Sequence, residues 1–422
     1  MTSDTCSISR EGAGNPSGHA DSGGSVATSP PLATTGAVSG DGCSSARAVH
    51  LLTSSRLRLY QSCPRAHHYR YEVGLTPTAP ETGARALGTA VHAGLEAWWV
   101  AHKEGAPQYA LPSAFRSAED AFPFDEHFTL AMIRALITGY DAAWCDWAAG
   151  VEVLGVELPF EAPLTHPVTG APSATWRIAG KLDALVRLSD GRVAIVEHKT
   201  KSGDASAGSD YRRRLTLDPQ VSTYFEGVRA LGYTPDLCLY DVLVKPAIKV
   251  LTATPEEDRV YTQEKSRACK ECRKAAKNRT PEPHFEDGIA CVDGRIVTDT
   301  GGRLRAGQRD RDETATEYEK RLIDTIAADR DRYLVHAEIV RSDAEREAHQ
   351  WALWHAVRSI EETRRAARVA RDVRAVPQSP ASCFGTGHKC PYLDICEGTA
   401  SARDTTRFKR LPTVHPELSP QT

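Results

Sequence analysis

Long apolar runs are missing from this sequence. No stretch approaches the roughly 18 to 20 consecutive apolar residues that a membrane-spanning helix requires, and the first residues lack the basic and then apolar segments of a secretory leader. We therefore expect a cytoplasmic protein with no membrane partner. A Gly-x4-Gly-Lys-Ser/Thr loop, which binds nucleotide phosphates, is also missing. The chain is therefore not expected to be a motor driven by nucleotide hydrolysis.

The sequence also lacks an excess of charge of either sign. Its 422 residues carry a formal net charge of −3, so no overall field attracts it to nucleic acid, and any such binding needs a local basic cleft. Hydrophobic residues make up 41% and charged residues 25%, as in a soluble globular chain. In a reducing compartment, the 11 cysteines favour metal or iron–sulfur ligation, or buried thiols, over disulfides.

Large apolar side chains are almost absent from residues 1–47, which are dominated by Gly, Ser, Thr, Ala and Pro. Such a segment cannot offset the entropy of ordering, so we expect a disordered tail. One folded domain is expected over residues 48–400, including a helical region at about 314–374 made of two long helices. Residues 401–422 are polar and contain proline, and we expect a second tail there.

Periodicity within the folded part predicts a mixed α/β architecture. Apolar residues at helical spacing predict helices over 84–103 and 126–148. Asp218 and Pro219 have the cap and first-turn chemistry of a further helix. Short apolar or alternating runs predict strands over 151–161, 174–188, 192–199, 236–245 and, more briefly, 247–252.

The most informative stretch, residues 180–199, has the pattern of a β-hairpin. Alternation along its second strand puts Glu197 and Lys199 on one face. A two-residue turn would place Asp183 on the wrong face, whereas a three-residue loop with Gly191 in the left-handed conformation sets Asp183 opposite Glu197. We predict the three-residue loop.

Two carboxylates at one place on a strand pair predict a metal site. Asp183 and Glu197 repel each other unless a cation binds between them, and oxygen ligands suit Mg²⁺ or Mn²⁺. Such an ion activates water and neutralises charge on a phosphodiester. Lys199 would orient the water or stabilise the transition state. The alternative is an edge hairpin with an ordinary Glu–Lys surface pair.

Further groups for such a site lie on the predicted helices. Imidazole suits a metal ligand, so His92 is a candidate, although a lone histidine on a helix is more often structural. Gln220 and Tyr224 stand four residues apart and face the same way. They can hydrogen-bond a DNA phosphate or base, and Tyr224 can stack on one; the alternative is a half-buried polar seam. A Gly/Ser-rich loop ending in Arg212-Arg213-Arg214 either binds phosphates or is only solvated.

Three late cysteines, Cys383, Cys390 and Cys396, lie in a Gly-containing loop with a Cys-Pro-Tyr sequence. Thiolates in such a loop favour zinc or an iron–sulfur cluster. Cys63 is the best-placed fourth ligand because it too precedes a proline. The alternative is a set of free thiols.

A separate Cys-x-x-Cys pair, Cys269 and Cys272, is followed at a distance by Cys291. A zinc site there needs a fourth ligand, for which His284 is the candidate. Because a second paired Cys or His motif is missing, the sequence leaves the role of this pair open.

Five separate features follow one another in a recognisable order. They are Gly88-Thr89-Ala90-Val91-His92, Gly180-Lys181-Leu182-Asp183, Glu197-His198-Lys199, Gln220-x-x-x-Tyr224, and the frame of Cys63 with the late cysteine triplet. Together they resemble the RecB-type PD-(D/E)XK nucleases with an iron–sulfur cluster, a group that includes the AddB nuclease domain and CRISPR-associated exonucleases. The resemblance covers about residues 53–397.

The resemblance implies a restriction-endonuclease-like fold, in which a mixed central sheet is flanked by helices and carries helical additions. It assigns divalent-metal binding to His92, Asp183 and Glu197, catalysis to Lys199, and DNA contact to Gln220 and Tyr224. It also implies a [4Fe-4S] cluster that joins the N- and C-terminal parts through Cys63, Cys383, Cys390 and Cys396.

One departure from the family pattern concerns the cluster. The family usually spaces its last three ligands as Cys-x2-Cys-x5-Cys, whereas six residues separate Cys383 from Cys390 here. His388 is therefore an alternative to Cys383 as a ligand.

We therefore expect a Mg²⁺- or Mn²⁺-dependent deoxyribonuclease that acts from single-stranded ends in recombination, repair or phage DNA processing. A separate helicase or recombinase would be its partner, because the chain lacks a nucleotide-binding loop of its own. One rival is a spacer-processing exonuclease of a CRISPR adaptation complex. The other is a non-catalytic zinc- or cluster-bearing DNA-binding module, in which the hairpin acids are surface charges.

Overall fold

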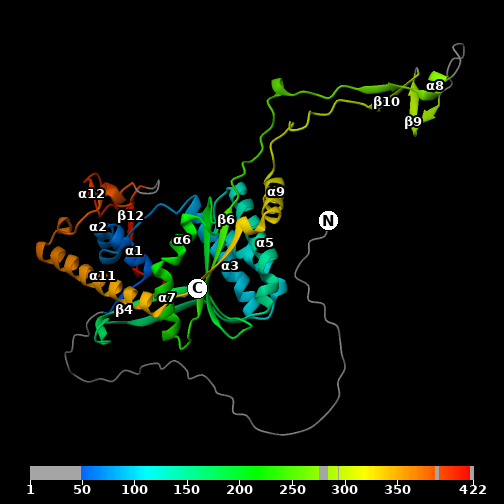
Figure 1. Cartoon of the computed structure of the whole chain (residues 1–422). Helices are drawn as coiled ribbons and strands as arrows, with labels where there is room; N and C mark the ends of the chain where they lie inside the picture. Colours follow the sequence, from blue (N-terminus) through cyan, green and yellow to red (C-terminus); the bar gives the residue numbers. More distant parts are fainter. Residues whose placement is uncertain (1–48, 275–283, 293, 385–388, 419–422) are drawn as a thin grey trace, which may run out of the picture.

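A mixed β-sheet lies at the centre of the molecule (Figure 1). The structure is a computed structural model that describes residues 49–274, 284–292, 294–384 and 389–418. Within these ranges the sheet has six strands in the order β1-β4-β5-β6-β11, with β3 paired to β4 off this path. The strands are β1 (His50–Leu52), β3 (Glu152–Thr165), β4 (Pro172–Arg187), β5 (Val193–Ser202), β6 (Leu237–Lys245) and β11 (Leu334–Ile339).

The β4–β5 hairpin has the predicted register. Leu188 N–H donates to the Arg192 carbonyl at 2.8 Å, which closes a three-residue loop. Gly191 in this loop has φ +88°, a conformation that strains residues with a Cβ. The antiparallel pairs run from Arg187 with Val193 to Ala184 with Val196, one step before Asp183 and Glu197. The predicted loop and register are therefore confirmed.

Helices cover both faces of the sheet (Figure 1). Contacts to β5 assign the faces, since Trp99 bonds to His198 on one side and Gln220 bonds to Glu197 on the other. No helix within the described ranges is both long and apolar enough to cross a membrane. The main helices are α3 (Ala84–Lys103), α4 (Ala110–Asp120), α5 (His127–Ala149), α6 (Asp210–Thr216), α7 (Pro219–Ala230), α9 (Ala315–Ala328) and α11 (Asp343–Ala370), with the short α10 (Arg330–Tyr333) after α9.

The structure differs in detail from three local expectations. The described residues 247–252 form no strand, because the chain leaves the sheet after β6. The three arginines after β5 lie on α6, whose first turn is capped by the Ser209 hydroxyl accepting the Arg212 N–H at 3.3 Å. The predicted pair of long helices is confirmed as α9 and α11, but β11 lies between them and pairs antiparallel with β6.

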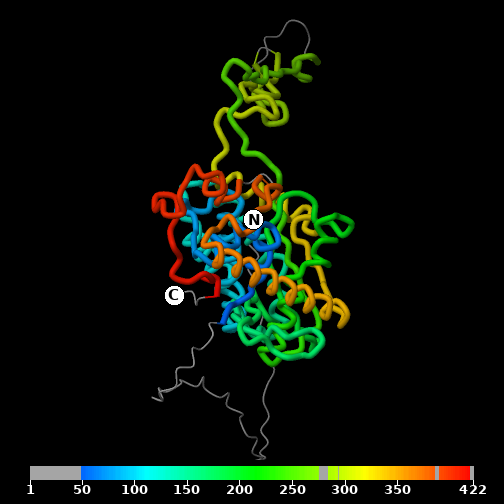
Figure 2. Tube along the Cα trace, turned by 90° about the vertical axis from the view of Figure 1, so that its left-hand side faces the viewer, coloured from blue at the N-terminus to red at the C-terminus, as the bar shows by residue number. Residues whose placement is uncertain are grey.

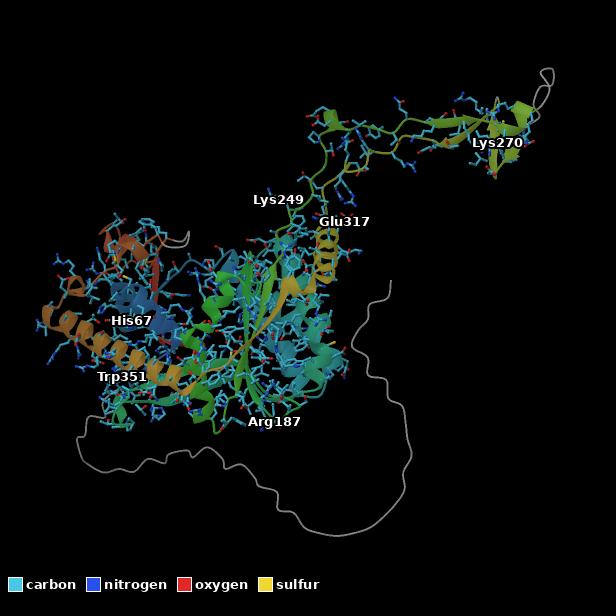
Figure 3. The ribbon with its side chains drawn as sticks, viewed as in Figure 1. His67, Arg187, Lys249, Lys270, Glu317 and Trp351 are labelled. Atoms are coloured by element: carbon cyan, nitrogen blue, oxygen red, sulfur yellow. The ribbon has the colours of Figure 1, made fainter. Side chains whose placement is uncertain are left out.

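An arm extends from the body between β6 and α9 (Figures 1 and 2). In Figure 3, Lys249 and Glu317 mark its two connections to the body, and Lys270 lies near its far end. Its described part contains a four-stranded antiparallel sheet in the order β7-β10-β9-β8. The arm elements are β7 (Lys265–Ala268), α8 (Lys270–Lys274), β8 (Phe285–Glu286), β9 (Ile289–Val292) and β10 (Arg295–Asp299).

The N- and C-terminal parts of the described chain lie side by side (Figures 1 and 2). Arg65 N–H donates to the Pro377 carbonyl at 3.0 Å, and the Tyr392 hydroxyl donates to the Leu75 carbonyl at 2.8 Å. The elements involved are α1 (Ser54–Ser62), α2 (Pro64–His67), β2 (Leu75–Pro77), α12 (Leu393–Cys396) and β12 (Phe408–Arg410).

The expectation of a polar tail from residue 401 is wrong for the described residues 401–418. Strand β12 pairs antiparallel with β2, and Phe408 is buried in a small second core. A three-residue strand with one buried aromatic leaves too short a pattern to detect in a polar sequence. The expected N-terminal tail, residues 1–47, lies outside the described residues.

Candidate functional site

The candidate site lies in the middle of β4, at the point on one of its edges between the pairings with β1 and with β5. Strand β3 runs along one edge of β4, while β1 and β5 share the other edge and pair with it at 176–178 and 184–187. Asp183 stands immediately before the β5 pairing. Its Oδ2 accepts the His198 backbone N–H at 2.8 Å, so the carboxylate continues the ladder in place of a carbonyl. This bond fixes Asp183 at the mouth of the hairpin.

Glu197 and Lys199 leave the same face of β5, as the alternation predicts. Glu197 is 2% exposed, and its Oε1 accepts hydrogen bonds from Lys199 Nζ and, at 2.9 Å, from Gln220 Nε2. Its other oxygen, Oε2, is buried and has no hydrogen-bond partner in the described ranges of the chain. A buried carboxylate oxygen without a donor is costly, and a cation is one of the few groups that can compensate it.

The pKa values of the two carboxyl groups are shifted in opposite directions. Burial and the nearby charge of Asp183 raise the pKa of Glu197 to about 7. Burial also disfavours ionised Asp183, but the charge of His92 and the hydrogen bond from His198 outweigh it and hold the Asp183 pKa below its ordinary value. A divalent cation between them would favour ionisation of both groups.

The third predicted metal ligand, His92, approaches from α3. Its Nδ1 lies 3.6 Å from Asp183 Oδ2, with its side chain 36% exposed. Gly88, one turn earlier, allows this approach, because a Cβ there would lie 3.3 Å from Thr200 Oγ1 of β5. His92, Asp183 and Glu197 do not form a group with all ligand atoms within 4.8 Å in the described residues. Glu197 is turned instead toward Lys199 and Gln220.

His198, which sequence reasoning did not select, supports the site from behind. Its Nδ1 lies 3.4 Å from Asp183 Oδ2, and its Nε2 accepts the Trp99 indole N–H at 3.1 Å. The indole contact places the proton of a neutral ring on Nδ1, facing Asp183. Tyr140 is 3.2 Å from the same Nε2 and donates to Asp241 at 2.8 Å. The sequence did place His198 on the buried face of its strand by alternation, but an ordinary core residue has the same pattern.

Helix α7 brings Gln220 to the carboxylates. Asp218 caps the helix by accepting the Gln220 N–H at 2.9 Å, and the Tyr240 hydroxyl donates to the other Asp218 oxygen at 3.0 Å. Tyr240 stands directly beside Glu197 in the parallel β5–β6 pairing. The cap predicted at Asp218 and Pro219 is therefore confirmed, and it fixes the position of α7 relative to the site.

Gln220 and Tyr224, predicted from sequence as DNA contacts, lie next to the candidate metal ligand Glu197. Gln220 bonds Glu197 directly, and its Nε2 lies 2.5 Å from the Tyr224 hydroxyl. The Tyr224 ring is buried edge-on against Phe160. Stacking of this ring on a base, as expected from sequence, is not available in this conformation, because Phe160 and the helix enclose it.

The kinds of donor atom present suit a divalent cation, which would bind once Glu197 turned from Lys199 toward Asp183 and His92. The donor set combines a buried carboxylate, Glu197, with a half-buried one, Asp183, and an adjacent imidazole, and Glu197 Oε2 has no hydrogen-bond partner among the described residues. The pKa of Lys199 is also raised. Burial of its ammonium group lowers this pKa, but the negative charges of Glu197 and Asp183 outweigh that effect. The site therefore pairs metal-ligand chemistry with a fixed positive charge.

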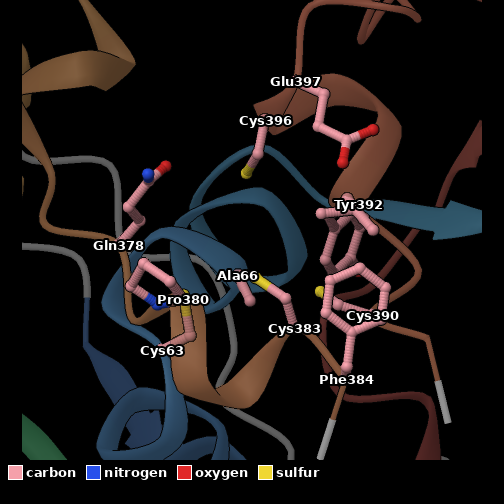
Figure 4. A pocket seen from close by; sticks show the side chains of 11 residues that line it. Cys63, Ala66, Gln378, Pro380, Cys383, Phe384, Cys390, Tyr392, Cys396 and Glu397 are labelled. Atoms are coloured by element: carbon pink, nitrogen blue, oxygen red, sulfur yellow. The ribbon is translucent and has the colours of Figure 1, made fainter.

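The four cysteines predicted as cluster ligands line one pocket. Cys63 enters it from the start of α2, and Cys383, Cys390 and Cys396 enter it from the C-terminal part. The pocket has a volume of about 190 Å³, and Figure 4 shows the thiols around it. His388, the alternative to Cys383, lies outside the described residues.

The spacing of these thiols bears on what they can hold. Two sulfurs on one tetrahedral zinc lie about 3.8 Å apart, given Zn–S bonds of about 2.3 Å. Within the described residues, no three of these four cysteines have all their sulfurs within 4.8 Å of one another. The pocket therefore brings the four thiols together without setting three of them at zinc-ligand distances.

Comparison with known proteins identifies the class. The family model of the PD-(D/E)XK nuclease superfamily matches residues 51–397, and the chain belongs to this superfamily. Its members are nucleases that use divalent metals. No curated protein matches the chain.

Among solved structures, the crystal structure of SSO0001 is similar at 12% identity and a TM-score of 0.20. The match covers 46% of this chain and 62% of that chain, so this protein spans less than two thirds of its length.

Proposed function

We propose that the protein is a Mg²⁺- or Mn²⁺-dependent deoxyribonuclease that hydrolyses phosphodiester bonds from single-stranded DNA ends. The observation that carries the proposal is the placement of Asp183 and of the Glu197–Lys199 pair at the open end of one hairpin, with Glu197 Oε2 buried and without a hydrogen-bond partner in the described part of the chain. Superfamily membership supports the reaction type.

Each residue has a distinct task in this proposal. Asp183, Glu197 and His92 hold the divalent cation, which supplies water activation and neutralises phosphate charge. Lys199 donates a hydrogen bond to the attacking water or to the phosphate oxygens as negative charge develops. Hydrolysis forms a P–O bond to water and breaks the P–O bond to the leaving sugar oxygen, which takes up a proton. Gln220 holds Glu197 and Lys199 in place, with Lys199 Nζ 3.5 Å from its Oε1.

DNA would reach the site along α6 and the start of α7. Arg213 and Arg214 on α6 are exposed, and exposed guanidinium groups bind backbone phosphates. Gln220 is only half-buried and can contact a bound strand. Any contact from Tyr224 is restricted to its hydroxyl, through Gln220.

We further propose the RecB-type assignment with a [4Fe-4S] cluster. The support is the meeting of Cys63 with Cys383, Cys390 and Cys396 around one pocket. Such a cluster would act as a structural cross-link between the two ends of the domain. A separate helicase or recombinase in the cytoplasm would supply single-stranded ends during recombination, repair or phage DNA processing.

A cleavage assay tests the central proposal. Purified protein is incubated with single-stranded and blunt duplex DNA labelled at either the 5′ or the 3′ end, with Mg²⁺, Mn²⁺ or a chelator. We expect stepwise shortening of the single strand with metal and none with chelator. The label that is released first gives the polarity.

The rivals predict different products. A spacer-processing exonuclease would trim overhangs of partly duplex DNA to a fixed length in the presence of a CRISPR integrase. A non-catalytic DNA-binding module would bind DNA in a gel shift and leave it intact with either metal. The second result would refute the nuclease proposal.

Gln220 offers a test of how the site is positioned. We expect Gln220→Ala to lower turnover by about 10²-fold, the scale of a slightly misplaced catalytic group, while the midpoint of thermal unfolding changes little because the residue is half-buried. If Gln220 also contacts DNA, binding of uncleaved DNA in Ca²⁺ should weaken in parallel. Unchanged turnover would remove Gln220 from the catalytic site.

Tyr224→Phe is the matched variant on the same helix. It removes only the hydroxyl next to Gln220 Nε2 and retains the buried ring. We expect a loss of about 1 kcal/mol in unfolding free energy, the usual net value of one hydrogen bond, and a smaller effect on turnover than in Gln220→Ala.

A further inference from the structure

We propose that the arm is a zinc-binding module in which Cys269, Cys272, His284 and Cys291 hold one structural Zn²⁺. These four residues are a group, within the described parts of the chain, whose ligand atoms all lie within 4.8 Å of one another. The proposed site lies in the arm and plays no part in the nuclease chemistry proposed above, so the two can fail separately.

The distances between the ligand atoms fit a tetrahedral ion. Cys269 Sγ is 3.1 Å and Cys272 Sγ is 3.6 Å from His284 Nε2, and Cys272 Sγ is 3.6 Å from Cys291 Sγ. With Zn–S near 2.3 Å and Zn–N near 2.0 Å, the tetrahedron edges are about 3.8 Å between two sulfurs and about 3.5 Å between sulfur and nitrogen. A disulfide is ruled out for Cys272 and Cys291, because its sulfurs would be about 2.05 Å apart.

The backbone holds the four ligands in this arrangement. Cys291 N–H donates to the His284 carbonyl at 2.7 Å, which ties these two ligand residues together through the backbone. Cys269 N–H donates to the Gly294 carbonyl at 2.8 Å, and Cys272 N–H points to Cys269 Sγ at 3.5 Å. An N–H directed at a sulfur stabilises the thiolate, the form that binds metal.

Glu286 also approaches the group but is already engaged. Its Oε2 lies 3.1 Å from Cys269 Sγ and accepts the Lys270 N–H at 2.8 Å, while Oε1 accepts from Arg267. We therefore assign Glu286 to holding the α8 turn through the Lys270 N–H, and His284 to the ligand position beside the three cysteines.

The arm also needs a cross-link to be stable. In the described part of residues 261–304, the fully buried side chains are those of Cys269 and Ile296. Phe285 is 71% exposed and Val292 is 62% exposed. A module of about 40 residues without a hydrophobic core generally requires disulfides or a metal to fold. The four ligands cluster where the arm lacks that core.

Metal analysis of the full-length protein tests the proposal. We expect one zinc per chain, and X-ray absorption at the zinc edge should show three sulfurs at about 2.3 Å and one nitrogen at about 2.0 Å. Cys291→Ser should reduce bound zinc at least tenfold and expose the arm to protease. Cys145→Ser, which changes a half-exposed cysteine on α5, is the matched control and should retain zinc.

Two further variants keep the test decisive. His284→Cys should retain zinc and change its shell to four sulfurs, a result that a metal bound elsewhere would not give. Cys63→Ser should retain zinc, because Cys63 lies in the other cysteine pocket. Zinc retained in Cys291→Ser, zinc lost in Cys63→Ser, or a full-length protein without zinc after equilibration with Zn²⁺ would each overturn the assignment.

Discussion

Replacing either hairpin carboxylate by its amide should abolish DNA cleavage while leaving DNA binding intact. Asp183→Asn can still accept the His198 backbone N–H, so the strand ends stay joined. Glu197→Gln keeps the shape of a side chain that is 2% exposed. We expect turnover to fall on the order of 10³-fold or more, since each change removes a preorganised charge from the reaction centre. Phosphate contacts from basic residues should maintain binding.

The double variant discriminates a shared role from two independent ones. If Asp183 and Glu197 hold one cation, Asp183→Asn with Glu197→Gln should be no slower than either single variant, because residues that act as a unit are strongly non-additive. Glu161→Gln changes an exposed glutamate on β3 and should cleave normally. Losses that multiply in the double variant would contradict a common metal site.

Stability without metal gives an independent measurement of the same pair. Burial and the charge of Asp183 raise the pKa of Glu197 to about 7, so the ionised pair is held together at a cost. Glu197→Gln removes that repulsion, and the metal-free variant should be at least as stable as the parent in thermal unfolding. Mg²⁺ should raise the unfolding temperature of the parent and not that of the variant. Equal shifts in both would place the cation elsewhere.

Local signals were sufficient for the elements that surround the site. Apolar spacing gave the α3 bounds as 84–103, and a glycine after Asp190 gave the loop that sets the hairpin register. Side-chain alternation then placed Glu197 and His198 on opposite faces of β5. What it did not show is that Gln220 bonds Glu197, because that contact depends on how α7 packs across the sheet, and long-range packing leaves no periodic signal.

The arm and the C-terminal part of the described chain were predicted least well from the sequence. Strand β7 pairs with β10 about 30 residues later, and these short strands have mostly exposed side chains, so their pattern resembles that of a loop. Their organisation comes from four ligand residues instead of a core. Strand β12 pairs with β2 across more than 300 residues, a contact that only the folded molecule reveals.

Replacing Cys63 in the pocket that it shares with Cys383, Cys390 and Cys396 should also have a large effect, on bound iron and on stability. The protein purified without oxygen should be brown and carry about four irons per chain. Cys63→Ala should lose that iron, because it removes the one ligand contributed by the N-terminal part. The control is again Cys145→Ser, which should stay brown. A colourless parent with zinc in this pocket would refute the iron–sulfur proposal.

The stability change measures what the cluster does for the fold. A cross-link between residue 63 and the segment around Cys383 to Cys396 closes a loop of more than 300 residues. The chain-entropy estimate for such a loop is on the order of 5 kcal/mol, which is an upper bound. Part of the joint remains without the cluster, through β2 with β12 and the Arg65 bond to Pro377. We therefore expect Cys63→Ala to unfold at lower denaturant concentration and to release residues 389–418 to protease before the central sheet unfolds. Iron loss without any change in unfolding would show that these backbone contacts alone hold the ends together.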